Sequence, residues 1–110
     1  MVKLTIGYKI WLKRGDTELI GPGGIALLKA IAREGSLKSA AKSLGMSYVF
    51  AWRYLRKLEK CLGKPIVETR RGGKRRGATT LTAHGLKLLE IYEKAWTEFE
   101  KLSRELKFEI

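Results

Sequence analysis

Two helix-forming segments separated by one glycine constrain the fold of this chain more than any other feature of its sequence. Ser36 is a natural N-cap for a helix over residues 37–44, because its hydroxyl can accept a hydrogen bond from an amide of the first turn. Gly45 ends that segment, and Ser47 is the natural N-cap of a longer helix over residues 48–62. Two helices joined by so short a turn predict a helix-turn-helix.

The second helix presents two different faces. One face is apolar and is expected to lie against the core: Ala51, Leu55, Leu58 and Leu62. The opposite face carries aromatic, apolar and cationic side chains: Tyr48, Val49, Trp52, Arg53 and Arg56. Gly63 and Pro65 then end the helix, since proline cannot continue it.

A glycine-rich cationic stretch follows the second helix. Residues 65–69 (PIVET) and 78–82 (ATTLT) are β-prone and flank residues 70–77 (RRGGKRRG), so together they predict a β-hairpin with an extended tip. We call this hairpin, residues 65–82, the wing. Its cations are Arg70, Arg71, Lys74, Arg75 and Arg76. A basic hairpin directly after the second helix indicates a winged helix-turn-helix, whose cations bind phosphates or line the minor groove and release condensed counterions. The alternative is a solvated run of charge.

The charge of the chain is unevenly distributed. The formal net charge is +12, and residues 83–110 contribute −1, so residues 1–82 carry +13. Such an imbalance attracts polyanions, of which nucleic acid is the commonest. An anionic membrane surface is the alternative, but no long uncharged apolar run or signal peptide is present. The lone Cys61 excludes an internal disulfide and suits a reducing compartment. We therefore expect a cytoplasmic, chromosome-associated protein.

The N-terminal part predicts a strand, a turn and a helix. Apolar and polar residues alternate over residues 1–13, which is typical of a strand with one buried face. Residues 14–24 (RGDTELIGPGG) supply turn chemistry, so an N-terminal hairpin is expected within residues 1–24. A helix over residues 25–34 follows and ends at Gly35.

The last segment predicts a long helix with an apolar seam. Thr82 is its expected N-cap, and about 24 helical residues span about 36 Å. The seam residues recur every three or four positions: Leu88, Tyr92, Ala95, Phe99, Leu102 and Leu106. A seam this long exceeds what one small domain can cover, so we expect a homodimer interface within residues 83–110. The alternative is that the helix folds back onto Leu28, Trp11 and the N-terminal strand.

Together these elements predict a single domain over residues 1–110. Its fold class is mainly α with a small β component (α+β), as a winged helix-turn-helix. Residues 1–24 form an N-terminal strand or hairpin, residues 25–82 the helix-turn-helix with its wing, and residues 83–110 a long dimerisation helix.

The ordered set of motifs resembles two known families. Residues 36–68 (SLKSAAKSLGMSYVFAWRYLRKLEKCLGKPIVE), followed by residues 81–89 (LTAHGLKLL), are similar to the DNA-binding domain of LysR-type bacterial regulators. The chain is closer still to the N-terminal domain of ModE-type molybdate-responsive regulators, through IALLKAIA at 25–32, SYVFAW at 47–52 and VETRRGGK at 67–74. The resemblance implies DNA binding and dimerisation, but not the molybdate sensor of those regulators. No residue here can be assigned to a molybdate site.

The helix over residues 48–62 is the expected recognition helix. Its candidate DNA contacts are Ser47, Tyr48, Val49, Trp52, Arg53 and Arg56. The guanidinium forks of Arg53 and Arg56 suit guanine or phosphate because they are bidentate, and Val49 suits a thymine methyl.

Several of these residues have a second interpretation. Ser47 serves equally as a helix cap or a phosphate contact. Trp52 either contacts DNA or packs beneath the wing. Ser36 and Lys38, at the start of the preceding helix, are candidates for a flanking phosphate. The wing cations position the protein on DNA more than they specify sequence.

Catalytic chemistry has little support in the sequence. His84 is the only histidine and Cys61 the only thiol, and no phosphate-binding glycine motif or cluster of metal ligands occurs. The predicted function is that of a sequence-specific double-stranded DNA-binding transcriptional regulator, a homodimer without an effector domain, cofactor or metal. The alternatives are a sequence-independent architectural DNA-binding protein and a protein-interaction module.

Overall fold

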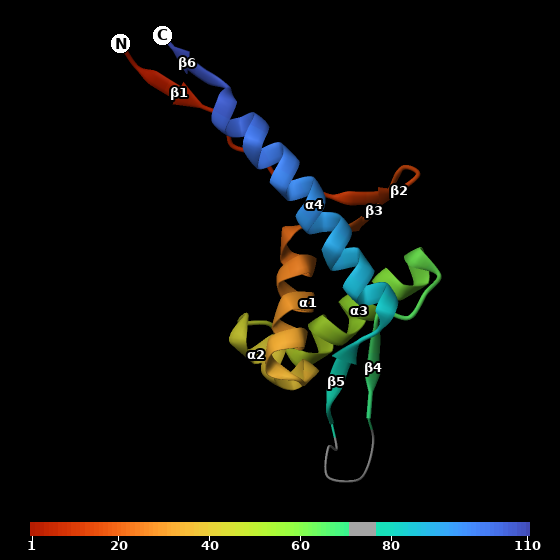
Figure 1. Ribbon diagram of the computed structural model, residues 1–110. Helices are drawn as coiled ribbons and strands as arrows, with labels where there is room; N and C mark the ends of the chain where they lie inside the picture. Colours follow the sequence, from red (N-terminus) through yellow and green to blue (C-terminus); the bar gives the residue numbers. More distant parts are fainter. Residues whose placement is uncertain (71–76) are drawn as a thin grey trace.

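Figure 1 shows the computed structural model, which describes residues 1–70 and 77–110. In these residues the chain forms β1 (Lys3–Thr5), β2 (Leu12–Arg14), β3 (Thr17–Ile20), α1 (Pro22–Glu34), α2 (Leu37–Ser43), α3 (Tyr48–Leu62), β4 (Val67–Thr69), β5 (Thr79–Leu81), α4 (Ala83–Glu105) and β6 (Lys107–Glu109). The strands form three two-stranded antiparallel sheets, β1–β6, β2–β3 and β4–β5. The predicted fold class, mainly helical with a small β component, is confirmed.

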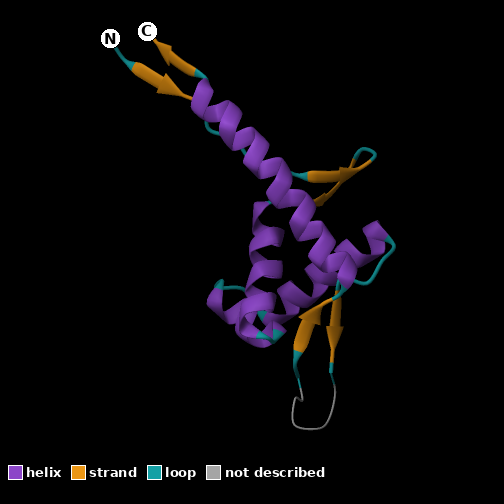
Figure 2. Cartoon of the chain, in the orientation of Figure 1, coloured by secondary structure: helices purple, strands orange, loops and turns teal. Residues whose placement is uncertain are grey.

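Helices α1, α2 and α3 pack around one core (Figure 2). From α1 the core takes Leu27, Leu28, Ala30 and Ile31. From α3 it takes Ala51, Leu55 and Leu58, the apolar stripe that the sequence predicted. Helix α1 begins at Pro22, earlier than predicted, because proline is tolerated in a first turn that needs no amide donor.

The helix-turn-helix forms as its caps predict. The Ser36 hydroxyl accepts a hydrogen bond from the Ser39 amide at 3.0 Å, and the Ser47 hydroxyl accepts one from the Phe50 amide at 3.1 Å. Gly45 links the two helices with φ = 68°, a left-handed conformation that costs glycine little. These caps fix where α3 begins and therefore which of its residues reach the surface.

The predicted wing is confirmed at its base. Val67 pairs with Leu81 and Thr69 with Thr79, and the Arg70 amide donates to the Ala78 carbonyl at 2.8 Å. Thr79 is buried, and its hydroxyl accepts a hydrogen bond from the Leu37 amide at 3.3 Å, which ties the wing to the start of α2. The predicted tip residues Arg71, Lys74, Arg75 and Arg76 lie outside the described residues.

The N-terminal prediction is only half correct. The hairpin is present as β2–β3, and Arg14 holds it to the C-terminal end of α3 by donating to the carbonyls of Cys61 and Leu62 at 3.0 and 3.3 Å. The alternating run before it is not one strand: β1 ends at Thr5, and its residues are exposed. Alternation of apolar and polar residues indicates which side chains share a face of an extended segment. It does not show which other strand that segment pairs with.

The partner of β1 is a strand that the sequence did not predict. Helix α4 begins after the Thr82 cap, as expected, but it ends at Glu105, and β6 follows it. Leu4 pairs with Phe108 in the resulting ribbon, so the two ends of the chain lie side by side (Figure 1). Leu106 therefore lies beyond the helix, because the chain turns there into an extended conformation.

Helix α4 projects from the body, so the molecule is elongated (Figure 1). The extents of the whole molecule are 62 × 30 × 21 Å. The N-terminal segment runs along the helix, as the fold-back alternative anticipated: the Tyr92 hydroxyl donates to the Ile10 carbonyl at 3.3 Å and the Ser103 hydroxyl to the Ile6 carbonyl at 2.8 Å. The Tyr8 hydroxyl donates to Glu100 at 2.6 Å. We call this projection, residues 1–8 and 95–110, the arm.

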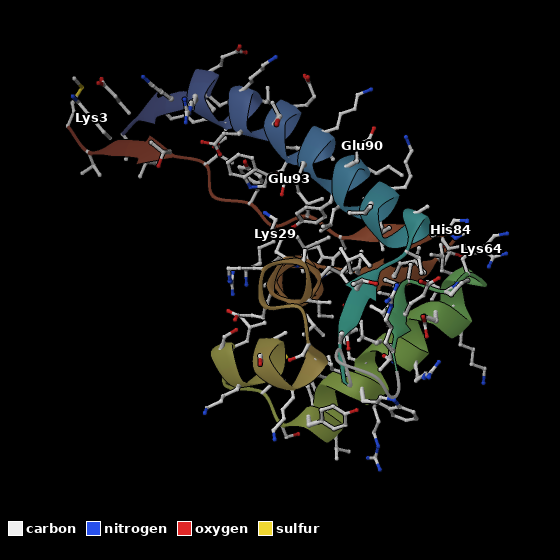
Figure 3. The ribbon with its side chains drawn as sticks, turned by 60° about the horizontal axis from the view of Figure 1, so that its bottom comes forward. Lys3, Lys29, Lys64, His84, Glu90 and Glu93 are labelled. Atoms are coloured by element: carbon white, nitrogen blue, oxygen red, sulfur yellow. The ribbon has the colours of Figure 1, made fainter. Side chains whose placement is uncertain are left out.

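An ion pair joins the middle of α4 to the body. Lys29 of α1 points toward Glu93 of α4 (Figure 3), and the two side chains form a salt bridge that is half exposed. Such an exposed pair contributes little free energy, so the helix is held to the body mainly by Leu88 and Tyr92, which are buried in the core. No helix in the described part of the chain is long and apolar enough to span a lipid bilayer.

Candidate nucleic-acid interface

The exposed face of α3 gathers the predicted recognition residues. Tyr48, Val49 and Trp52 are 52, 55 and 44% exposed, and Arg53 and Arg56 are exposed on the same side of the helix. Apolar side chains of this size are normally covered in a soluble protein, so a contiguous group of them indicates a contact surface. Trp52 is therefore not a core residue.

Arg56 is held in place on this face. Its guanidinium carbon lies 5.2 Å from the centroid of the Trp52 ring, which is the geometry of a cation–π contact. Its Nη1 donates to Oε1 of Glu59 at 3.2 Å. The guanidinium is thus bounded by an aromatic face and a carboxylate, both from its own helix.

Glu59 joins this face to the base of the wing. Its second oxygen, Oε2, accepts hydrogen bonds from the amides of Ile66 and Val67 at 2.8 and 3.4 Å. The side chain of Glu59 is only 12% exposed. Glu59 was not among the residues predicted from the sequence. Its spacing from Arg56 is visible there, but its contact with the Ile66 amide depends on the turn at Gly63.

The other predicted contact residues lie on separate elements rather than on one face. Arg70 lies exposed at the top of the described wing, and Lys38 lies exposed on α2. The hydroxyls of Ser36 and Ser47 both accept amide hydrogen bonds as helix caps, which is one of the two roles the sequence left open for Ser47. His84 is exposed at the start of α4.

A third face of α3 lines a groove beside α1. Tyr54, Lys57 and Cys61 face the Gly21–Gly24 turn and Trp11 across an opening of about 340 Å³. Burial raises the pKa of Tyr54, whose hydroxyl lies where a Cβ on Gly24 would stand. No group of three or more His, Cys, Asp or Glu side chains suited to a metal ion occurs among the described residues.

The predicted seam of α4 divides into a covered part and an exposed part. Leu88 and Tyr92 are only 6% exposed, because the core of the same chain covers them. That burial removes these two from the predicted interface. Phe99, Leu102 and Leu106 are 50, 48 and 37% exposed, and Ala95 is intermediate. Ile91, which the prediction did not include, is 45% exposed beside them.

The capped helix pair, the hairpin directly after it and the exposed face of its second helix define a winged helix-turn-helix protein. Residues 24–86 match the family of bacterial regulatory helix-turn-helix proteins of the lysR family. The chain belongs to this family.

Curated relatives include ModE regulators. The chain is 39% identical over 82 residues to the transcriptional regulator ModE of Haemophilus influenzae, which covers 74% of this chain and 32% of that protein. It is 38% identical over 72 residues to the DNA-binding transcriptional dual regulator ModE of Escherichia coli, covering 66% of this chain and 28% of that protein. The chain therefore spans about a third of the length of these relatives. The resemblance to ModE-type regulators is confirmed.

Solved structures of LysR-type proteins share the fold. The CbnR DNA-binding domain, solved in complex with DNA, matches with a TM-score of 0.55 and 28% identity, covering 72% of this chain and 90% of that one. ArgP from Mycobacterium tuberculosis matches with a TM-score of 0.57 and 27% identity, covering 79% of this chain and 31% of that one.

Proposed function

We propose that this chain is a sequence-specific, double-stranded DNA-binding transcriptional regulator that acts as a homodimer in the cytoplasm, associated with the chromosome. The observation that carries the proposal is the exposed aromatic and cationic face of α3, directly beside the base of the wing. Membership of the lysR family and the likeness to a domain solved on DNA support it.

The proposed binding mode follows from the positions of the elements. The first turns of α3 enter the major groove, where Tyr48, Val49 and Arg53 contact base edges. The wing, which extends from the end of the body opposite the arm (Figure 1), contacts phosphates through Arg70 and the tip cations. Because residues 1–82 carry +13, association is fast and strongly dependent on salt.

A comparison of two arginine variants tests the DNA-binding proposal. DNA fragments selected from a random pool define the preferred site, and affinities are then measured on that site and on random duplex over a salt series. Arg53→Ala is expected to lower the specificity ratio by about 1–3 kcal/mol, whereas Arg70→Ala weakens both duplexes alike. Lys13→Ala, at an exposed residue of β2 outside the proposed DNA surface and the proposed dimer contact, is the control and leaves both unchanged. Equal losses on both duplexes for Arg53→Ala would instead indicate architectural, sequence-independent binding.

The proposed dimer forms through the exposed part of α4. Phe99, Leu102 and Leu106 are large apolar side chains that a single chain leaves half exposed, and burying one of them fully contributes roughly 1.5–3 kcal/mol. The distribution of charge also favours this part of the chain as the dimer contact. Residues 83–110 have a net charge of −1, whereas two copies that met through the body would bring together most of the +13 carried by residues 1–82.

The charge pattern of α4 favours an antiparallel pair. Lys94, Glu98, Lys101 and Glu105 lie on one exposed row, with alternating sign. This row meets the same row of the second copy only in an antiparallel pair, where Lys94 faces Glu105 and Glu98 faces Lys101 of the second copy. An antiparallel pair also places the two bodies at opposite ends of the arms.

Equilibrium sedimentation tests the dimer. Leu102→Glu is expected to give monomers, because it introduces a charge into the apolar contact. Leu86→Glu is the matched control: Leu86 is 57% exposed but lies on the opposite side of α4, so this variant stays dimeric. An unchanged mass for Leu102→Glu would exclude this interface.

A further inference from the structure

The guanidinium of Arg56 is held more firmly than its exposure suggests. The side chain is 61% exposed, yet it lies over the Trp52 ring and donates to Glu59. Exposed arginines ordinarily sample many rotamers, and ordering one on binding costs free energy. Here two contacts from the same helix order the side chain before any partner arrives.

Glu59 is itself unable to move away. Its Oε2 accepts hydrogen bonds from the amides of Ile66 and Val67, at the start of β4. Its side chain is only 12% exposed. Releasing it would leave backbone donors without a partner, which is costly in a partly buried site. The carboxylate therefore acts as a fixed anchor, and the orientation of the Arg56 fork is set by the backbone at the base of the wing.

The anchored fork suits a planar partner better than a phosphate. A guanidinium has five N–H donors in one plane, and Glu59 uses only one of them. A phosphate can also accept two hydrogen bonds from a guanidinium, but the carboxylate of Glu59 beside the fork repels its negative charge, whereas guanine is neutral. Guanine presents O6 and N7 as two coplanar acceptors in the major groove, which match a fixed fork.

We propose that Arg56 is the residue that recognises a guanine, one in each half-site, with Glu59 as its positioning residue and Trp52 as its platform. This inference rests on the proposed function, in which α3 lies in the major groove. Arg53 carries no ion pair in the part of the chain that the structure describes, so it is free to adapt to a neighbouring base or phosphate.

The test uses the full chain and sites selected from random DNA. The wild type is expected to select a guanine at one position of each half-site. Replacing that guanine by adenine lowers affinity about 5- to 150-fold, and replacing it by 7-deazaguanine, which lacks the N7 acceptor, also weakens binding. Arg56→Met keeps the length of the side chain but removes every donor, so it binds guanine, 7-deazaguanine and adenine sites with similar affinity. Arg33→Met, the same change at an exposed residue of α1 outside the proposed DNA surface, is the matched control and keeps the guanine preference.

Glu59→Gln separates positioning from folding. It is expected to retain binding to random duplex and to lose most of the discrimination at the guanine position. In the Arg56→Met background the same change has no further effect on that discrimination, because Glu59 acts through Arg56. A Glu59→Gln variant that lowers stability alone, with the guanine preference intact, would assign it a purely structural role.

The outcomes separate this inference from the proposed function. If the wild type selects a site and Arg56→Met keeps its guanine preference, the assignment of Arg56 is wrong while sequence-specific binding stands. If the wild type selects no sequence at all, both are wrong.

Discussion

Gly85 lies where the first turn of α4 crosses the start of the wing. Its amide donates to the Thr82 hydroxyl, which in turn donates to the Pro65 carbonyl at 2.6 Å. A Cβ at this position would stand 2.5 Å from the Ile66 carbonyl oxygen. Because that neighbour is backbone of the wing base, it cannot move aside without disturbing the amides held by Glu59.

We therefore expect Gly85→Ala to destabilise the protein. The clash costs about 1–3 kcal/mol, which outweighs the roughly 1 kcal/mol that alanine returns in helix propensity. Denaturant unfolding measures the loss. Gly23→Ala is the matched control, since nothing lies within 4 Å of a Cβ there, and it should leave stability unchanged or slightly raised. Equal behaviour of the two variants would contradict the close approach.

Ser47 combines a cap with a position on the proposed DNA surface. Its hydroxyl accepts a hydrogen bond from the Phe50 amide, so Ser47→Ala should lower the free energy of unfolding by about 1 kcal/mol. Ser47→Asp keeps the cap, because aspartate is an equally good N-cap, but brings a negative charge to the DNA surface. We expect wild-type thermal stability and weaker DNA binding for Ser47→Asp. Unchanged DNA affinity would show that Ser47 acts as a cap alone.

The caps could be predicted from the sequence because capping acts over three residues. The contacts of Glu59 could not, since they depend on where the chain returns after Gly63. The same distinction applies to Trp52, for which the sequence left two roles open. Only the packed structure, with Leu55 and Leu58 turned inward, places the Trp52 ring on the surface under Arg56.

The elements around the arm show a similar limit of sequence reasoning. The alternation over residues 1–13 correctly indicated extended chain, but the pairing of β1 with β6 joins opposite ends of the sequence. A three-residue strand such as β6 carries too little pattern to be recognised beside a long helix. The seam of α4 was recognised, but which half the body would cover depended on the angle at which the helix leaves it.

The contact between Tyr8 and Glu100 stabilises the arm over a limited range of pH. Partial burial and the hydrogen bond to Glu100 raise the pKa of Tyr8 to about 12, and the hydrogen bonds from Tyr8 and Arg104 lower the pKa of Glu100. The lowered carboxyl contributes stability that is lost as pH falls through its folded pKa, below 4.5. The raised phenol contributes stability that is lost as pH rises from 10 through about 12.

We expect hydrogen exchange protection of β1 and β6 to hold between these limits and to fall outside them. In the Glu100→Gln variant the pKa of Tyr8 should move back toward 10, because one of its causes is removed. Ultraviolet titration of the phenol in that variant measures the change. A Tyr8 titration unaltered by Glu100→Gln would show that the hydrogen bond does not form in solution.

The whole molecule separates two tasks by charge and by distance. The body and wing carry the positive charge, and the nearly neutral arm leaves the body at the end opposite the wing. Two copies that meet through their arms can therefore associate without bringing their cationic surfaces together. The proposed dimer and the proposed DNA surface occupy different parts of the chain, so each can be altered without the other.

This separation predicts a dependence on half-site spacing. In a symmetric dimer, two recognition helices match half-sites one helical turn (about 34 Å) or a whole number of turns apart. Inserting about 5 base pairs between the half-sites rotates one to the opposite face of the duplex, so the wild type should lose most of its affinity. Leu102→Glu, as a monomer, should bind both spacings equally and at the lower affinity of a single half-site. Gel-shift titrations on the two duplexes measure this, and a wild type indifferent to the insertion would mean that the copies bind DNA independently even where their arms associate.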